Sequence, residues 1–268
     1  MRQIGLIGAG NMGGAILHGV VADGSIRASQ LMVYDTNQKK TDDLANELPG
    51  LRVAVDGNDL ARQCDVIILA VKPHFIMNVI DGIRGSLNGK AVISIAAGWT
   101  VSMLADALDG TGATYLRVMP NTPAMVGEGM TALCDDSTFS KEDFAFAKSL
   151  FDALGRTVVL PERLFDGVTA ISGSSPAYVF MMIEAMADAG VKEGLPRACA
   201  YEMAAQAVLG SALMVLSSGT HPAALKDAVC SPGGTTIDAV AVLEKKGFRS
   251  AIMEAMAACA DKSREMSK

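Results

Sequence analysis

A glycine-rich loop near the start of the chain constrains its fold more than any other feature. The apolar run Ile4–Ile7 leads directly into the spacing G-x-G-x-x-G, and apolar residues at helical spacing follow. In this context the first glycine permits a tight turn, the second lets the backbone approach a pyrophosphate, and the third lets helix and strand pack closely. The sequence therefore predicts a dinucleotide whose phosphates lie at a helix N-terminus. The loop residues are Gly8, Ala9, Gly10, Asn11, Met12 and Gly13.

An acidic residue stands where a dinucleotide-binding unit needs one. The second apolar run, Leu31–Tyr34, ends at Asp35, about 20 residues beyond the glycine loop, where an acid accepts hydrogen bonds from the adenine ribose. The next residues offer donors and positive charge that suit a 2′-phosphate instead. These are Thr36, Asn37, Lys39 and Lys40. The two tendencies oppose each other, so the residues leave the choice between NADP(H) and NAD(H) open.

Strand and helix patterns alternate through the first part of the chain. Strands are predicted at Arg52–Val55, Val66–Val71, Ala91–Ala96 and Thr114–Met119, with helices at 39–47, 75–83 and 101–108 between them. This alternation predicts an α/β fold with a doubly wound parallel sheet. Ligands of such sheets bind beyond the carboxyl ends of the strands. The loops Val71-Lys72-Pro73, Ala96-Ala97-Gly98 and Pro120–Pro123 are therefore expected to open toward the cofactor.

The second part of the chain has a different character. After a predicted strand at Thr157–Leu160 the pattern is helical, and 268 residues exceed the usual size of one domain. We predict a Rossmann-type domain over residues 1–160 and an all-helical domain over residues 161–268. The segment Tyr201–Leu216 is apolar nearly all round, so more than one face must be covered. Burial within the monomer would satisfy this, but a homodimer or higher homo-oligomer is favoured.

Composition and cysteine spacing argue against several classes of partner. The net charge is −6, lysine and arginine are scattered, and aromatic residues make up 5% of the chain, which argues against nucleic acid. Apolar runs look too short for a membrane span, and the apolar start continues into the glycine loop. The five cysteines lie far apart, without C-x-x-C or a histidine at ligand spacing. We expect no metal site, no disulfide framework and a cytoplasmic location.

A second loop with possible chemistry lies near the end of the chain. Residues 231–236 read Ser-Pro-Gly-Gly-Thr-Thr and open a helical pattern. The glycines let successive backbone N–H groups converge, and Thr235 and Thr236 can cap the helix. A helix N-terminus also favours an anion. The loop therefore reads either as an ordinary capped turn or as a pocket for a small carboxylate.

Several motifs together carry a resemblance that covers essentially the whole chain. They are GAGNMGGA at 8–15, AVKP at 70–73, IAAG at 95–98, MPNTP at 119–123, GSSPAY at 173–178 and LKDAVCSPGGTT at 225–236. With these motifs the chain resembles the pyrroline-5-carboxylate reductases, which make proline. One departure is Ser175, where many relatives carry glycine. Because serine has a side chain, the resemblance does not extend to a close approach of the backbone at this position.

The resemblance implies NADP(H), with NAD(H) also accepted, bound at the sheet, and a swapped dimer of helical domains. It implies a cofactor site that includes Thr36, Asn58, Ala70, Val71, Lys72, Pro73, Ala96, Ala97 and Gly98. It places the substrate against Asn121, Val229, Ser231, Gly233, Gly234, Thr235 and Thr236. Thr236 would hydrogen-bond the ring nitrogen, since an imine that binds already protonated needs no strong general acid.

Two other functions fit parts of the sequence. A β-hydroxyacid dehydrogenase shares the glycine motif and a helical second domain, but that family carries a lysine on the first long helix after the sheet. Residues 173–190 contain no lysine. A non-catalytic dinucleotide-sensing module gives no reason for the Pro-Gly-Gly-Thr-Thr loop. His18, His74 and His221 read as structural histidines.

Overall fold

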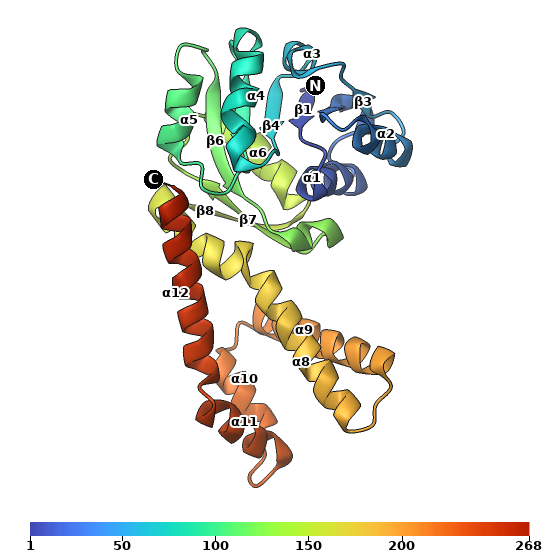
Figure 1. Ribbon diagram of the computed structural model, residues 1–268, viewed down its shortest axis with the longest axis vertical. Helices are drawn as coiled ribbons and strands as arrows, with labels where there is room; N and C mark the ends of the chain where they lie inside the picture. The colour runs from blue at the N-terminus through green and yellow to red at the C-terminus, as the bar shows by residue number, and fades with distance from the viewer. Residues whose placement is uncertain (268) are drawn as a thin grey trace. The chain divides into compact units, whose positions relative to one another are not determined.

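The computed structural model describes residues 1–267, and the chain divides into two compact units. The first unit comprises residues 1–174 together with the chain from Cys259 onward, and the second comprises residues 175–258 (Figure 1). The predicted boundary at 160/161 coincides with the end of the last strand, whereas the chain leaves the first unit only after Ser174. The division into domains at 160/161 therefore stays a prediction.

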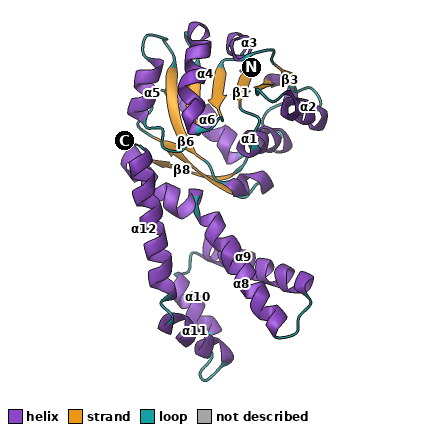
Figure 2. Cartoon of the chain, in the orientation of Figure 1, coloured by secondary structure: helices purple, strands orange, loops and turns teal. Residues whose placement is uncertain are grey.

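An eight-stranded sheet forms the centre of the first unit (Figure 2). Its order is β3-β2-β1-β4-β5-β6-β7-β8. The strands are β1 (Ile4–Ile7), β2 (Leu31–Tyr34), β3 (Arg52–Val53), β4 (Val66–Leu69), β5 (Ala91–Ser94), β6 (Thr114–Met119), β7 (Gly129–Cys134) and β8 (Gly155–Leu160). The strands from β3 to β6 pair in parallel, as the alternating pattern predicts.

The edge of the sheet differs from a wholly parallel arrangement. β7, which the sequence pattern did not reveal, pairs antiparallel with β6, and β8 then pairs parallel with β7. Only the short 3₁₀ helix η4 (Thr122–Val126) connects β6 to β7. A parallel neighbour requires a crossover of a dozen or more residues. Because this connection is shorter, β7 runs antiparallel to β6.

Helices cover both faces of this sheet, because side chains alternate along each strand. One core contains Leu6 of β1 and Ile68 of β4 and receives side chains from α1, α2 and α6. The other contains Ile7 and Ile67 of the same strands and receives side chains from α3, α4 and α5. These helices are α1 (Asn11–Ala22), α2 (Gln38–Glu47), α3 (Gly57–Gln63), α4 (Ile76–Ile83), α5 (Val101–Leu108) and α6 (Lys141–Asp152).

The remaining elements of the first unit are short. They include η2 (Pro73–Phe75), η5 (Glu162–Leu164), α7 (Phe165–Val168) and a π-helical turn, η6 (Thr169–Gly173). Side-chain caps set three helix starts: Asp56, Thr100 and Ser140 each accept the N–H of the residue three positions on. Each such cap satisfies one donor that the helix itself leaves unpaired.

The second unit is helical, and no strand lies in residues 161–267, as the sequence predicts. Its helices are α8 (Ser175–Lys192), α9 (Arg197–Ser218), α10 (Pro222–Val229), α11 (Thr235–Lys245) and the first part of α12 (Phe248–Met266). Within α8 and α9 only Ala187, Ala200 and Ala204 are buried. Large apolar side chains, including Phe180, Met181, Met203, Leu213 and Met214, are exposed in the single chain.

The apolar character of α9 requires a correction. We expected no run long enough to span a membrane, yet Arg197–Ser218 is long and apolar enough to do so by length and composition, with 11% of its most apolar window buried. A helix that packs against a second subunit has the same composition, because an interface core removes apolar side chains from water just as a protein interior does. Length and composition therefore do not distinguish the two.

Candidate functional site

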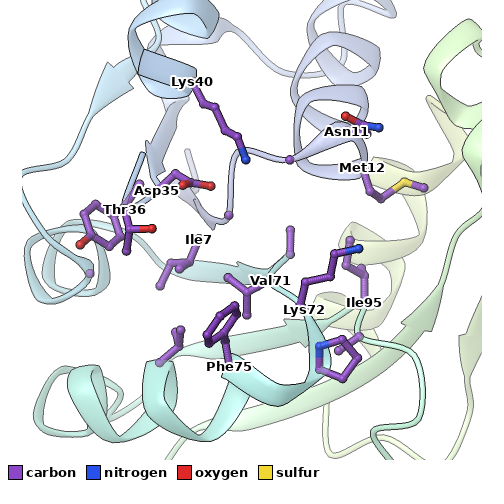
Figure 3. A pocket seen from close by; sticks show the side chains of 18 of the residues that line it. Ile7, Asn11, Met12, Asp35, Thr36, Lys40, Val71, Lys72, Phe75 and Ile95 are labelled. Atoms are coloured by element: carbon purple, nitrogen blue, oxygen red, sulfur yellow. The ribbon is translucent and has the colours of Figure 1, made fainter. Parts of the chain in front are cut away.

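A pocket of about 1160 Å³ lies at the carboxyl ends of the parallel strands in the first unit. Its wall contains the residues that directly follow β1, β2, β4 and β5, together with Met119 and Pro120 at the end of β6. Figure 3 shows Asp35 and Lys40 on one side of the pocket and Lys72 and Ile95 on another. This is where doubly wound sheets bind their ligands, and the volume suits a dinucleotide.

Most of the predicted cofactor residues line this pocket. They are Gly8, Gly10, Asn11, Met12, Asp35, Thr36, Asn58, Ala70, Val71, Lys72, Pro73, Ala96 and Ala97. Ala9, Gly13 and Gly98 are not part of the wall. Residues that sequence reasoning missed include Tyr34, Gly57, Phe75, Asn78, Met125 and Gly173. Phe75 had a usable signal in the sequence, because it is a large aromatic residue two positions after the predicted cofactor loop Val71-Lys72-Pro73.

The three glycines of the loop meet different steric demands. Gly8 has φ +111°, and a Cβ there would lie 2.6 Å from the Ala70 carbonyl oxygen. A Cβ on Gly13 would lie 2.1 Å from the Gly8 carbonyl oxygen, so this glycine allows α1 to pack on β1. A Cβ on Gly10 would meet no atom within 4 Å, because it points into the open pocket. That open cradle at the start of α1 fits a pyrophosphate.

Asp35 holds the glycine loop as well as facing the pocket. Its Oδ2 accepts the N–H of Ala9 at 2.7 Å, and its Oδ1 accepts the N–H of Asn37 at 2.8 Å. The carboxylate therefore ties the end of β2 to the loop that follows β1. Each carboxylate oxygen has capacity for a further bond, so a contact with the ribose stays a prediction.

The two neighbouring lysines that the sequence could not tell apart behave differently. Lys39 pairs with Asp43 along α2 at 2.6 Å, and this hydrogen bond raises the pKa of Lys39. Lys40 lines the pocket instead and extends into it near Asp35 (Figure 3). Because the adenosine end of a dinucleotide lies at the end of β2 in such folds, we predict that Lys40 rather than Lys39 contacts a 2′-phosphate.

The three histidines each have a local contact. His18 contacts Glu47 at 3.0 Å, His74 packs its ring against Phe75, and the Nδ1 of His221 accepts the N–H of Ala223 at the start of α10. None of the three belongs to the wall of the described pocket. Their interpretation as structural histidines stays a prediction.

Asn121, which the resemblance places against the substrate, has both ends of its amide engaged within the first unit. Its Nδ2 donates to the Ser172 carbonyl at 3.2 Å, and its Oδ1 accepts the Met130 N–H at 2.8 Å. The residue is buried and is not part of the pocket wall, although its neighbours Pro120 and Thr122 are. A contact between Asn121 and the substrate stays a prediction.

The other predicted substrate residues all belong to the second unit, between the end of α10 and the start of α11. Gly233 has φ +66°, and the Gly234 N–H donates to the Ser231 carbonyl at 3.0 Å in a tight turn. The loop residues themselves are exposed or half-buried. None of Val229, Ser231, Gly233, Gly234, Thr235 and Thr236 lines the pocket of the first unit.

The expectation that a threonine caps α11 is wrong. The N-cap is Gly234, without a side-chain capping bond, and Thr235 and Thr236 already lie in the first helical turn. A threonine caps only from the non-helical position before the helix. The first backbone bond of the helix joins the Asp238 N–H to the Gly234 carbonyl. The N–H groups ahead of it lie outside the helical ladder and can meet an anion.

One group of side chains has ligand spacing for a metal. Potential ligand atoms of Cys134, Asp135 and Asp136 lie within 4.8 Å of one another. Burial raises the pKa of the Cys134 thiol to about 11, and Asp136 already accepts the Glu162 N–H at 2.9 Å. Exposed acidic groups of this kind are common without an ion, so we assign no metal to this group.

The fold and the pocket define a class, the NAD(P)-dependent oxidoreductases with a dinucleotide-binding sheet and a helical second part. A family model described as "NADP oxidoreductase coenzyme F420-dependent" matches residues 3–98, and one described as "Pyrroline-5-carboxylate reductase dimerisation" matches residues 162–266. The pyrroline-5-carboxylate reductase of Escherichia coli is 50% identical over 268 residues, covering 100% of this chain and 99% of the relative. The chain belongs to the pyrroline-5-carboxylate reductase family.

More distant relatives and solved structures agree with this assignment. The Arabidopsis thaliana reductase is 40% identical, covering 99% of this chain and 96% of the relative. A Plasmodium falciparum pyrroline carboxylate reductase with NADP bound superposes with a TM-score of 0.90 at 34% identity, covering 100% and 98% of the two chains. The Coxiella burnetii reductase gives a TM-score of 0.91 at 34% identity, covering 100% and 99%.

Proposed function

We propose that the chain reduces 1-pyrroline-5-carboxylate to L-proline with NADPH as the hydride donor, the last step of proline biosynthesis. The observation that carries this is a dinucleotide-sized pocket at a glycine loop, in a chain that matches reductases of this substrate from end to end. The purified protein should consume NADPH only when pyrroline-5-carboxylate is added. A β-hydroxyacid dehydrogenase would instead reduce NADP⁺ with a hydroxyacid, and a sensing module would bind NADPH without turnover.

The residues of the first unit position the cofactor. The nicotinamide, when bound, supplies hydride to the imine carbon. The N–H groups at the start of α1 would hold the pyrophosphate, and Asp35 fixes their loop. Ala96, Ala97 and Pro120 line the same pocket at the ends of β5 and β6, away from the adenosine side expected at β2, and would hold the nicotinamide. Holding the two reactants in place supplies much of the rate enhancement.

The residues of the second unit bind the substrate in this proposal. The N–H groups at the start of α11 receive the carboxylate, and the helix dipole favours its negative charge. The Thr236 hydroxyl oxygen accepts the N–H of the protonated ring nitrogen. Since the imine binds already protonated, no group with a strongly shifted pKa is needed at that position.

Cofactor preference is expected to depend on Lys40. We expect a higher kcat/KM with NADPH than with NADH, and Lys40→Ala should lower kcat/KM for NADPH about tenfold while NADH is little affected, because a hydrogen bond to a charged group contributes about 1.5 kcal/mol or more. Lys39→Ala is the matched control, since Lys39 pairs with Asp43. A native preference for NADH by more than about tenfold, roughly 1.4 kcal/mol, would show that Asp35 dominates.

The apolar helices of the second unit support a homodimer in which the substrate loop of one subunit serves the cofactor of the other. Large exposed apolar side chains on α8 and α9 are expected to be covered by a second copy. The name of the matching family model, which refers to dimerisation, supports the same assembly.

Subunit mixing tests whether sites are shared. A chain with Gly10→Val lacks cofactor binding and a chain with Thr236→Val lacks the hydroxyl, yet their heterodimer would contain one intact site if each site uses both subunits. Activity should therefore reappear on mixing. Random exchange makes about half of the dimers heterodimers, and each heterodimer has one intact site out of two, so activity should reach up to about a quarter of the native value. Absence of recovery after verified subunit exchange would assign each site to one chain.

We also propose a reducing, cytoplasmic location. All five cysteines are free: Cys64 and Cys134 are buried, Cys230 and Cys259 are half-buried, and Cys199 is exposed. Burial raises the pKa of the Cys64 thiol to about 11, as expected for a cysteine that serves as a small core residue. Reduced cysteines are typical of cytosolic proteins.

A further inference from the structure

The helical segment that ends the first unit contains a defect with a chemical cause. Thr169–Gly173 forms a π-helical turn, in which the Ser174 N–H donates to the Thr169 carbonyl five positions back. In an α-helix the Ser172 carbonyl would accept the N–H of residue 176. Residue 176 is proline, which has no N–H. The Ser172 carbonyl therefore cannot obtain its usual helical donor.

Asn121 supplies the missing donor. Its Nδ2 lies 3.2 Å from the Ser172 carbonyl oxygen, and its Oδ1 accepts the Met130 N–H of β7 at 2.8 Å. Both Asn121 and Ser172 are 9% exposed, so water cannot readily replace this bond. A buried carbonyl without a donor costs about 1–3 kcal/mol. The amide thus connects three segments: the loop after β6, the strand β7 and the π-helical turn.

The segments that Asn121 connects form one part of the pocket wall. Pro120 and Thr122 flank Asn121 in the chain, Gly173 follows Ser172, and all three line the pocket. Gly173 also lies against Met119, because a Cβ at Gly173 would be 2.8 Å from the Met119 Cε. A shift of the turn would therefore move the wall at the ends of the strands where the nicotinamide is expected.

We infer that Asn121 is a positioning residue for hydride transfer, which acts by replacing the N–H that Pro176 lacks and so fixing Gly173 beside the loop 120–122. This role differs from the substrate contact that the resemblance implies, because both ends of the amide are already engaged by backbone groups. The inference rests on the proposed function where activity is measured, whereas the replacement of the Pro176 N–H by the Asn121 amide does not depend on that function.

A double-mutant cycle tests the inference. Asn121→Asp keeps an oxygen for the Met130 N–H but places an acceptor opposite the Ser172 carbonyl, whereas Pro176→Ala restores an N–H at the position that a helix requires. With N121D, kcat for pyrroline-5-carboxylate should fall at least tenfold while the Kd for NADPH changes less than about threefold, since the glycine loop and the residues after β2, which would hold the pyrophosphate and adenosine, are not bonded to Asn121. In N121D/P176A, kcat should return to within about threefold of P176A alone.

Thr131→Val serves as the control for burial. Thr131 is a fully buried residue of β7 whose hydroxyl has no hydrogen-bond partner within residues 1–267. The isosteric change should leave kcat unchanged. If N121D alone does not fold, the inference still requires that the double variant folds and is active.

Three outcomes would overturn the inference. They are native-like kcat in N121D, no recovery in the double variant, and a rise in KM for the substrate with kcat unchanged, which would indicate direct substrate binding. A native protein that fails to turn over the substrate would instead refute the proposed function. The cycle would then be scored by the melting temperatures of the four proteins, and additive shifts would still overturn the inference.

Discussion

Gly10→Val should remove NADPH binding and leave the fold intact. A Cβ at this position would meet no protein atom within 4 Å, and Gly10 has φ −82°, which valine adopts freely. The added methyl groups occupy the space where the backbone must approach the pyrophosphate. We expect the Kd for NADPH to rise by roughly 10²-fold or more, about 2.7 kcal/mol, with Tm unchanged. Calorimetric titration and thermal unfolding measure the two quantities.

Gly13→Ala provides the contrast within the same loop. Its Cβ would lie 2.1 Å from the Gly8 carbonyl oxygen and 3.0 Å from Leu6 Cδ2, so α1 must move away from β1. Overpacking of this kind costs about 1–3 kcal/mol, and Tm should fall by several degrees even without cofactor. If Gly10→Val instead lowers Tm as much as Gly13→Ala does, the space next to Gly10 is not open as we describe it.

Thr236→Val should impair catalysis more than binding. The substitution keeps the branched shape in the first turn of α11 but removes the proposed hydrogen-bond partner of the ring nitrogen. Losing one well-placed hydrogen bond in an active site typically lowers the rate by 10²–10³-fold, so we expect kcat/KM for pyrroline-5-carboxylate to fall on the order of 10²-fold. The Kd for NADPH should not change, because Thr236 does not line the dinucleotide pocket.

Two comparisons sharpen this second prediction. A cyclic imine without the carboxylate should show a raised KM with native enzyme, since it lacks the group that the α11 N-terminus receives. Full activity of Thr236→Val would refute the proposed hydrogen bond to the ring nitrogen. Ser231→Ala and Thr235→Val would then identify which neighbouring hydroxyl replaces it, and retention of activity in both would point to a bound water.

Local patterns predicted much of the fold because their cause is local. The strands β1, β4 and β5 are short apolar runs between turn residues, and helices separate them, so the chain itself shows a parallel sheet with two covered faces. The glycine loop is equally local, since turn, cradle and helix start lie within six residues. Thirteen of the predicted cofactor residues therefore line one pocket.

The missed features depend on contacts that residue types and spacings do not specify. β7 became a strand by pairing with β6 and β8. The start of α11 was predicted to have a threonine cap, but the turn from Ser231 to Gly234 set the boundary one residue earlier. Lys39 differs from Lys40 because it pairs with Asp43, whereas Lys40 lines the pocket.

The sequence by itself determined the class of fold, the cofactor loop and the family, because these depend on residue types at fixed short spacings. The tertiary structure alone decided what Asp35 and Asn121 do. Asp35 meets Ala9 across 26 positions of the chain, and Asn121 meets Ser172 across 51. A buried polar group must find a partner wherever the fold provides one, and no spacing within the sequence specifies which residue that will be.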